Sequence, residues 1–318
     1  MEKKELIVLT GPTAVGKTEL SLSLAKKVGG EIISADSMQV YRGMDIGTAK
    51  IQPDAMQGVR HHLIDICEPH ESFHVMAFQQ MAKKAMEEIY ERGHIPILTG
   101  GTGFYIQSVL YDIHFTDEKT DKQYRKELET IYREKGSATL HQMLEKVDEE
   151  SAKKIHAHNV KRVIRALEYY KETGEKFSVH NEREALRSSP YRFRYYVLTM
   201  PREILYQRIN DRVEQMVKQG LLEEVKTLYE QGYDRSFVSM QGLGYKECCR
   251  YFEGELSLEE AITLIKRDTR HFAKRQLTWF RKEKDVCMLD KMQFEDEAAL
   301  LSYMLQDLQQ HHVIDSKP

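Results

Sequence analysis

The sequence predicts an α/β protein in which a parallel sheet flanked by helices carries a helical insertion domain. Two observations support this class. In the first hundred residues, short apolar segments alternate with amphipathic segments of helical period, which is typical of parallel βαβ units. Residues 117–189, by contrast, are charged and helical in period and contain no convincing strand. We therefore expect a core domain of residues 1–114 and 191–318 and a helical insertion domain of residues 115–190.

Local signals place the elements of the core. Gly29 and Gly30 end the first helix, and Ser257 with Glu260 forms a capping box that begins the last long one. We expect strands at residues 5–10, 31–35, 95–99 and 191–199, and helices at 17–28, 75–92 and from 257 to about 282. The last ten residues are expected to form a frayed tail.

Composition excludes several classes of protein. The 318 residues are 41% hydrophobic and 31% charged, as in a soluble globular protein. No apolar run approaches the roughly 18 residues that span a bilayer, and no signal peptide is visible, so we expect a cytoplasmic protein with no membrane role. The four cysteines lack metal-site or disulfide spacing and are expected to be reduced thiols. With a net charge of −3, any nucleic acid must bind to local basic patches.

A P-loop pattern, G-x-x-x-x-G-K-[ST], follows the first predicted strand and opens the first predicted helix. This context strengthens the match, because backbone N–H groups and a helix N-terminus then surround a phosphate group. The lysine neutralises the outer phosphate, and the threonine hydroxyl is a ligand for Mg²⁺. The pattern predicts a P-loop NTPase-like fold and a di- or triphosphate site at Gly11, Pro12, Thr13, Ala14, Val15, Gly16, Lys17 and Thr18.

Two further segments follow strands at the same edge of the predicted sheet. Asp36 comes directly after the second strand and should face the phosphate site, because the carboxyl ends of parallel strands line the ligand crevice. Its position alone leaves a general base, an Asx-turn and an indirect Mg²⁺ contact open. Residues 100–103 read Gly-Gly-Thr-Gly, which would let a ligand approach closely or serve as a structural loop.

A cationic stripe is predicted on the helix that begins after Ser257. Eight Lys or Arg residues and two acids lie between Lys266 and Lys284. Helical spacing gathers one face from Arg267, Arg270, His271, Lys274, Thr278 and Arg281, opposite apolar residues that should pack on the protein. A smaller cluster, Lys161, Arg162 and Arg165, lies in the insertion. Together with the phosphate site, these clusters favour a polyanionic partner over a merely solvated face. Trp279 is expected in the core.

Arg208 and Arg212 share a face of the helix that Pro201 opens, since they are four residues apart. In small-molecule P-loop kinases, arginines placed in this way reach over the phosphates. The alternative is a pair of surface arginines.

These motifs together resemble one family, the tRNA dimethylallyltransferases, also called tRNA isopentenyltransferases. The resemblance covers nearly the whole chain, and the absence of a zinc-finger extension makes it similar to the bacterial form. Its most specific segment is 36–50, which generic P-loop kinases do not carry. The other matching segments are 11–18, 61–65, 100–105, 162–168, 242–247 and 274–281.

The family transfers a dimethylallyl group from dimethylallyl diphosphate to N6 of adenosine-37, beside the tRNA anticodon. The resemblance implies that the P-loop, with Arg208, holds the diphosphate of this donor rather than ATP. It implies that Asp36 orients the amine and accepts its proton. Lys17, Mg²⁺ on Thr18 and Arg212 would stabilise the leaving diphosphate. The adenine must be flipped out of its stem-loop to react.

The resemblance also implies where the tRNA anticodon stem-loop would bind, with the insertion domain taking part, and we expect the protein to act as a monomer. The positions that match the family's tRNA contacts are Asp36, Ser37, Met38, Gln39, Thr102, Arg125, Lys161, Arg162, Val163, Ile164, Arg165, Gln241, Gly242, Gly244, Lys246, Arg275, Gln276, Thr278, Trp279 and Arg281.

Two alternatives remain open from the residues themselves. The first is a small-molecule P-loop kinase or a prenyltransferase acting on free adenine nucleotide, neither of which needs the cationic helix or the insertion. The second is a non-enzymatic RNA-binding P-loop protein, against which an intact P-loop beside Asp36 argues.

Overall fold

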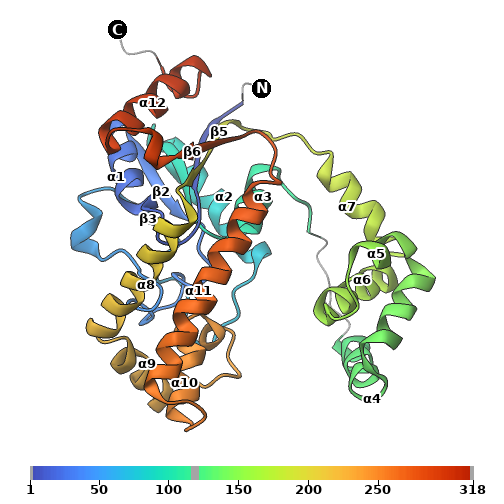
Figure 1. Cartoon of the computed structure of the whole chain (residues 1–318). Coiled ribbons are helices and arrows are strands. Elements are labelled where there is room, and N and C mark those ends of the chain that lie inside the picture. The colour runs from blue at the N-terminus through green and yellow to red at the C-terminus, as the bar shows by residue number, and fades with distance from the viewer. Residues whose placement is uncertain (1–2, 116–121, 316–318) are drawn as a thin grey trace. The chain divides into compact units, whose positions relative to one another are not determined.

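A computed structural model describes residues 3–115 and 122–315 of the chain (Figure 1). The chain divides into two compact units, one of Met1–Asp112 and Pro190–Pro318 and the other of Ile113–Ser189. The first unit contains the sheet, and every helix or strand in the described part of the second is a helix. Each unit has a hydrophobic core of its own.

The sheet of the first unit has six parallel strands in the order β3-β2-β4-β1-β5-β6, which confirms the predicted α/β class. Because β1 pairs with β4 on one side and β5 on the other, the P-loop that follows β1 starts at the middle of the sheet. The strands are β1 (Glu5–Thr10), β2 (Gly30–Ser34), β3 (His61–His62), β4 (Ile95–Gly100), β5 (Arg192–Thr199) and β6 (Val286–Asp290).

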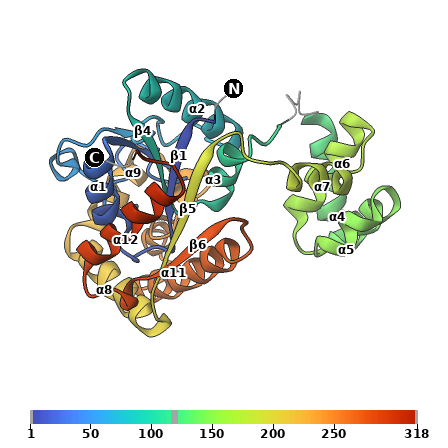
Figure 2. The same ribbon diagram turned by 90° about the horizontal axis from the view of Figure 1, so that it is seen from above.

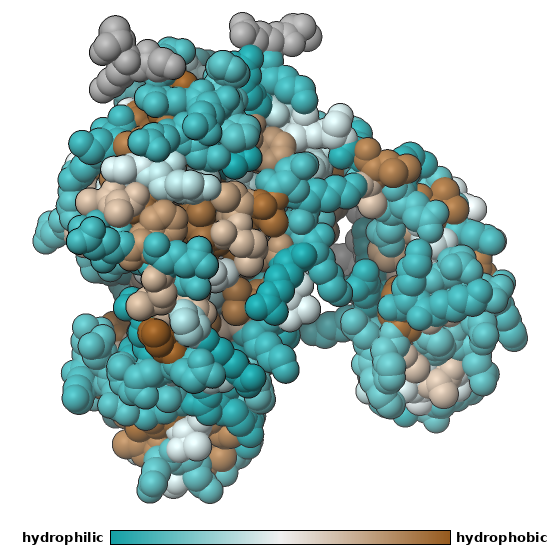
Figure 3. Space-filling view, turned by 45° about the horizontal axis from the view of Figure 1, so that its top comes forward, coloured by the Kyte–Doolittle hydropathy of each residue, from teal (hydrophilic) through white to brown (hydrophobic). Residues whose placement is uncertain are grey.

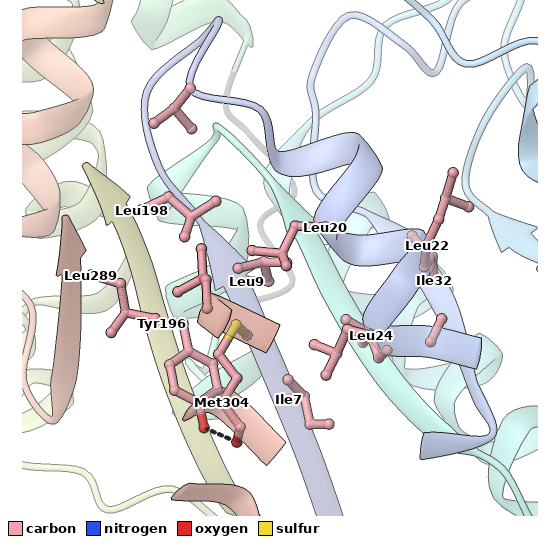
Figure 4. Close-up of a cluster of buried hydrophobic side chains, with 14 of the residues drawn as sticks. Ile7, Leu9, Leu20, Leu22, Leu24, Ile32, Tyr196, Leu198, Leu289 and Met304 are labelled. Atoms are coloured by element: carbon pink, nitrogen blue, oxygen red, sulfur yellow. Dashed lines mark hydrogen bonds between the residues drawn. The ribbon is translucent and has the colours of Figure 1, made fainter. Parts of the chain in front are cut away.

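Helices cover both faces of the sheet (Figure 2). The order of the strands requires this, since right-handed crossovers in opposite directions place successive helices on opposite faces. On one face α1 (Lys17–Val28) contacts α12 (Glu297–Gln310), and on the other α2 (Val75–Glu91) contacts α3 (Gly103–Leu110). Figure 4 shows the core between the sheet and the first of these layers, where Leu20 of α1 lies beside Leu9 of β1.

Four further helices of this unit pack on one another, α8 (Arg202–Lys218), α9 (Leu221–Glu230), α10 (Tyr245–Phe252) and α11 (Leu258–Phe280). They enclose a second core with the segment after β2, in which Val40 and Tyr41 are buried beside Val213 and Ile265. This arrangement brings the segment that contains Asp36 against α8 and α11.

The helical unit is built from α4 (Lys122–Val147), α5 (Glu149–Lys154), α6 (Val160–Thr173) and α7 (Phe177–Ala185). Gly136, at φ 79°, breaks α4 into two segments. Asp148, 1% exposed, joins two helices, because it accepts hydrogen bonds from the amides of Ser151 in α5 (3.1 Å) and Ser178 in α7 (2.8 Å). In the space-filling view, the visible surface of each unit is mainly hydrophilic with small apolar patches (Figure 3).

Three features differ from the sequence-based expectation. The strands β3 and β6 were not predicted: β3 has two residues, and β6 has one fully buried side chain, Leu289. The prediction that the last ten residues form a frayed tail is wrong for the described ones, because α12 extends to Gln310 and Val313 is 1% exposed within the core. Trp279 is 38% exposed rather than buried. No helix in the described ranges is long and apolar enough to cross a bilayer.

Candidate active site

The P-loop has the backbone of a phosphate cradle. Gly11 adopts φ 148°, where a Cβ would come within 2.6 Å of the Leu198 main-chain oxygen, so only glycine fits this turn. Gly16 is left-handed at φ 91° and caps α1. The Lys17 ammonium folds back over the loop and donates to the main-chain oxygens of Gly11 (3.0 Å) and Pro12 (2.8 Å). The cradle is therefore preformed at the N-terminus of α1.

Lys17 lies among charged groups. Burial and, to a lesser extent, the charge of Arg212 lower the pKa of its ammonium to about 8, and the charge of Asp36 opposes both effects. A lowered pKa of this kind marks a group that gains stability when an anion arrives. The P-loop, Arg212 and Asp36 thus belong to one electrostatic site.

Asp36 lies just beyond β2 and is half-buried. Its Oδ1 accepts hydrogen bonds from the amides of Met38 (2.9 Å) and Gln39 (3.4 Å), which is the Asx-turn that the sequence left open. Its second carboxylate oxygen has no hydrogen-bond partner among the described residues, and the side chain lines a pocket. One oxygen therefore holds the turn, and the other is available to a ligand.

The loop of residues 100–103 holds the backbone around Asp36. The Ala35 amide donates to Thr99 O (2.7 Å), the Thr102 amide donates to Ala35 O (3.1 Å), and the Ser37 amide donates to the Thr102 hydroxyl (3.2 Å). A Cβ on Gly100 would lie 2.2 Å from Ala35 O, so glycine is required for this approach. The structure thus gives these glycines a positioning function next to Asp36.

A pocket of about 340 Å³ opens at this point, within the first unit. Its polar side is lined by Thr13 and Ala14 of the P-loop, Asp36, Thr102 and Arg212. Its apolar side comes from α8, α9, α11 and the segments near them, namely Ile209, Val213, Met216, Leu221, Leu243, Ile265 and Phe272. Such a pocket suits a ligand with an anionic end and a short apolar end.

The two predicted arginines of α8 have different places. Arg212 lines the pocket, where burial lowers the pKa of its guanidinium and the carboxylates of Asp36 and Glu19 oppose that effect. Arg208 is exposed, and its Nε donates to the Ala14 main-chain oxygen at 2.9 Å. Arg208 therefore braces the P-loop, whereas Arg212 faces the ligand space.

Lys291 is a residue that the sequence analysis missed. It follows β6 in the short 3₁₀ helix Lys291–Gln293, at the same carboxyl edge of the sheet as the P-loop. A Cβ on Gly16 would meet its Nζ at 2.9 Å, so this ammonium lies against the P-loop backbone. Its long ion pair with Glu297, at 3.7 Å, leaves it free to turn toward an anion. The only sequence signal was a lysine at the end of β6, a strand that was itself not predicted.

The cationic stripe of α11 is only partly free. Arg270 donates to Asn210 at 2.6 Å, and Arg267 pairs with its neighbour Asp268 at 2.8 Å. Lys274 and Arg281 are exposed and make no ion pair within the described residues. We call these two side chains, with the exposed Thr278, the accessible part of the stripe; Arg267 and His271 are exposed as well, but Arg267 is paired.

The other predicted tRNA contacts are scattered. Thr102, Gln241, Lys246, Arg275 and the residues after β2 lie around the pocket. In the helical unit, the side chains of Val163 and Ile164 are 0% and 5% exposed in the core, so any contact of these residues with RNA would be made by their backbone. Lys161 and Arg162 are exposed on α6, and Arg165 is half-buried. Arg125 forms a bidentate pair with the buried Glu168, both contacts being 2.7 Å.

Gln276, another of the predicted tRNA contacts, makes contacts within the protein. It is 6% exposed and faces inward from α11. Its Oε1 accepts from the Thr13 amide at 2.9 Å, and its Nε2 donates to Gly101 O at 2.9 Å. The side chain thus joins the P-loop to the loop beside Asp36.

A divalent cation would have few protein ligands here. The described residues contain no cluster of three or more His, Cys, Asp or Glu side chains suited to a metal ion. Thr18, exposed at the first turn of α1, offers a hydroxyl next to the phosphate cradle. This donor set fits Mg²⁺ bound mainly by phosphate oxygens and water.

Comparison with known proteins shows the family of this chain. The sequence profile of the IPP transferase family matches residues 39–283. A tRNA dimethylallyltransferase of Lachnoclostridium phytofermentans is 57% identical over 97% of this chain and 99% of its own length. The chain belongs to the tRNA dimethylallyltransferase family. A second family member, from Carboxydothermus hydrogenoformans, is 54% identical over 90% of this chain and 92% of its own.

Solved structures of tRNA dimethylallyltransferases share the fold. The full-length tRNA isopentenylpyrophosphate transferase of Bacillus halodurans superposes with a TM-score of 0.73 at 46% identity, covering 98% of both chains. A eukaryotic dimethylallyltransferase captured acting on tRNA gives a TM-score of 0.82 at 30% identity, covering 99% of this chain and 81% of the other. The resemblance found in the motifs, including its bacterial form, is thereby confirmed.

Proposed function

We propose that this protein transfers a dimethylallyl group from dimethylallyl diphosphate to N6 of adenosine-37 in tRNA. The observation that carries the proposal is the pocket in which a P-loop and Asp36 face an apolar lining. The diphosphate would occupy the P-loop, and the five-carbon tail would lie against the side chains of α8, α9 and α11. A nucleoside triphosphate has no comparable apolar group next to its phosphates, which favours the prenyl donor over ATP.

The residues of the pocket have the chemistry that the transfer needs. The exocyclic amine of adenine attacks C1 of the donor, the C1–O bond breaks, and diphosphate leaves with the bonding electron pair. The free carboxylate oxygen of Asp36 accepts the proton that the amine loses. Lys17, Arg212 and the P-loop amides stabilise the charge that develops on the leaving oxygen.

Three features would assist the diphosphate. Arg208 braces the P-loop through Ala14 O, and Lys291 adds a positive charge next to Gly16. Thr18 would hold Mg²⁺, which would supply a further positive charge to the diphosphate.

The tRNA would bind through separate basic surfaces. Lys274 and Arg281 on α11 form one, and Lys161 and Arg162 on α6 form the other. Phosphate contacts position the RNA without reading its sequence, and the flipped adenine would enter the pocket beside Asp36 and Thr102.

The test is transfer of radiolabelled dimethylallyl diphosphate to unmodified tRNA, with AMP in place of tRNA and an adenosine-37 substitution as the two comparisons. We expect label in tRNA only when adenosine-37 is present, and none in AMP. Inorganic diphosphate should compete with the donor. Label on AMP, or tRNA-independent phosphoryl transfer from ATP, would contradict the proposal and favour one of the alternative P-loop enzymes.

A further inference from the structure

We propose that Gln276 is a positioning residue for prenyl transfer. Its side-chain amide fixes the position of the P-loop relative to the loop of residues 100–103, which holds the backbone around Asp36. The inference rests on the proposed function and adds to it a residue that acts through the protein backbone on both sides of the site. It starts from an arrangement of three chain segments that are distant in sequence and meet at one buried side chain.

The first step is the geometry of the amide. Oε1 accepts from the Thr13 amide and Nε2 donates to Gly101 O, both at 2.9 Å, and the side chain is 6% exposed. A buried peptide group without a partner is costly, so this one side chain satisfies a donor and an acceptor on opposite sides of the site. Only a group with both functions in a fixed geometry can do so.

The second step leads from Gly101 to Asp36. The residue after Gly101, Thr102, is bonded on both sides of Asp36, to Ala35 O through its amide and to the Ser37 amide through its hydroxyl. A displacement of Gly101 would therefore move the turn that orients the Asp36 carboxylate. The position of the base relative to the P-loop depends on Gln276.

The third step concerns α11 itself. Gln276 faces inward from the helix whose outer face exposes Lys274, Thr278 and Arg281. Arg275, its immediate neighbour, lines the pocket. The helix that we propose to bind tRNA thus carries the residue that joins the P-loop to the loop beside Asp36. RNA bound to α11 would therefore have a defined position relative to both loops.

Gly101 offers an independent test of the same contact. A Cβ built there would lie 2.2 Å from Gln276 Nε2 and meet nothing else within 4 Å except the carbon of the same amide. Its φ is not in the left-handed region, so alanine is compatible with the backbone. Gly101→Ala should therefore act mainly by displacing the Gln276 amide.

The main experiment is the pH profile of Gln276→Glu in prenyl transfer to tRNA. An ionised glutamate cannot donate to Gly101 O, whereas a protonated one can donate there and still accept from Thr13. Burial and the need to donate to the Gly101 oxygen favour the neutral acid, so the pKa of this carboxyl should lie well above its ordinary range. We therefore expect kcat to fall at least tenfold at pH 8 and to recover to within about threefold of wild type near pH 6. Gln276→Met should lose kcat at every pH and weaken inorganic diphosphate binding by less than threefold, because the P-loop keeps its own turn.

Gln79→Glu is the matched control, since Gln79 is 7% exposed, lies on α2 outside the site, and donates to Ser108 O at 2.7 Å. It should change thermal stability without producing a pH-dependent recovery of kcat. Gly101→Ala should lower kcat, and adding Gln276→Ala to it should cost little more, because the two changes disrupt one contact.

The proposal is overturned if Gln276→Glu retains wild-type kcat at pH 8, if its loss does not depend on pH, or if Gln79→Glu recovers in the same way. Should Gln276→Glu fail to fold, a Gly101→Ala protein with wild-type kcat overturns the proposal, and one with lowered kcat supports it. Failure of the proposed function itself would be seen separately, as a wild-type protein that binds diphosphate but transfers no label to tRNA.

Discussion

Arg208 donates from Nε to the main-chain oxygen of Ala14 at 2.9 Å. Four residues later on the same face of α8, Arg212 lines the pocket beside the P-loop and Asp36. The two arginines, which the sequence could not tell apart, thus differ in what they touch. One contacts the backbone of the P-loop, and the other faces the pocket.

Replacement of these arginines should separate binding from chemistry. Arg212→Ala should lower kcat by about 10²–10³, because it removes a cation that acts on the leaving group. Arg208→Ala should raise the KM for dimethylallyl diphosphate several-fold with a smaller change in kcat, since the P-loop loses a brace. Steady-state kinetics with saturating tRNA distinguishes the two. Equal effects of both variants on kcat would contradict this division.

Asp36→Asn is a sharper test of the base than Asp36→Ala. The asparagine oxygen can still accept from the Met38 amide, so the Asx-turn remains, but the side chain can no longer take up a proton. We expect kcat to fall by about 10²–10⁴ while the melting temperature and diphosphate binding stay unchanged. A kcat within threefold of wild type would mean that Asp36 only holds the Asx-turn and is not the base.

Lys17 makes ligand binding depend on pH. Its pKa of about 8 in the ligand-free protein should rise when a diphosphate binds next to it, so binding takes up a proton above pH 8. At pH 8.5 the uptake should be roughly half a proton or more. Calorimetric titration of dimethylallyl diphosphate in two buffers of different ionisation enthalpy measures it.

Lys17→Met is the control for that titration, because the ionisation of the ligand is common to both proteins and only the lysine differs. The difference in proton uptake between the two proteins should vanish if Lys17 is not the titrating group.

The same pKa also determines how folding stability changes with pH. Between about pH 8 and the usual lysine pKa of 10.5, the unfolded chain binds more protons at this residue, so folding stability from Lys17 rises with pH.

The accessible part of the α11 stripe should give a salt-dependent affinity. Each phosphate contact changes the slope of log K against log salt by about −0.7 to −0.9, so Lys274→Ala should flatten it by roughly one unit. Lys226→Ala on α9 removes the same charge from a lysine paired with Glu230 and should leave the slope unchanged. Parallel slopes for Lys274→Ala, Arg281→Ala and wild type would mean that tRNA does not bind to this face.

Glu31 should govern acid stability. Burial raises the pKa of this carboxyl, but hydrogen bonds from Arg92, His62 and His94 outweigh that effect and lower it to about 2. Its contribution is therefore complete above the usual glutamate pKa of 4.5 and is lost as the pH falls toward 2. Urea unfolding between pH 6 and 3 should show a loss on the order of 2 kcal/mol in wild type, smaller in Glu31→Gln.

Glu87→Gln is the comparison for this measurement, because Glu87 is exposed on α2. Its pH profile should follow that of wild type. If Glu31→Gln also keeps the full acid sensitivity, the buried network around Glu31 does not cause it.

Much of the fold could be predicted because hydrophobic periodicity and helix-capping residues mark its elements clearly in the sequence. The bounds of β1 and α1 match the expectation, and the predicted capping box is formed, with the Ser257 amide donating to Glu260 at 2.7 Å and the Glu260 amide to Ser257 at 3.2 Å. The strands β3 and β6 lacked such signals. A two-residue strand has no period, and the alternation of β6 is hidden by its half-exposed position at the edge of the sheet.

The site was predictable where a motif carried it and hidden where tertiary contacts did. The P-loop and Asp36 were found from their places after strands. The bridge from Gln276 to Thr13 and Gly101 spans most of the chain, and no local pattern encodes it. One signal was present: Gln276 comes eleven residues after Ile265, on the buried face of α11, where a polar side chain needs partners.

The place of β1 in the sheet has a consequence for synthesis of the chain. Leu6, Ile7, Val8 and Leu9 are fully buried, and β1 pairs with β4 on one edge and β5 on the other. In a nascent chain β4 is available early, whereas β5 leaves the ribosome only after the whole helical unit. Until then the apolar strand β1 has one edge whose backbone groups are unpaired, and such an edge can pair with strands of other chains. Fragments that end between residues 112 and 192 should therefore aggregate.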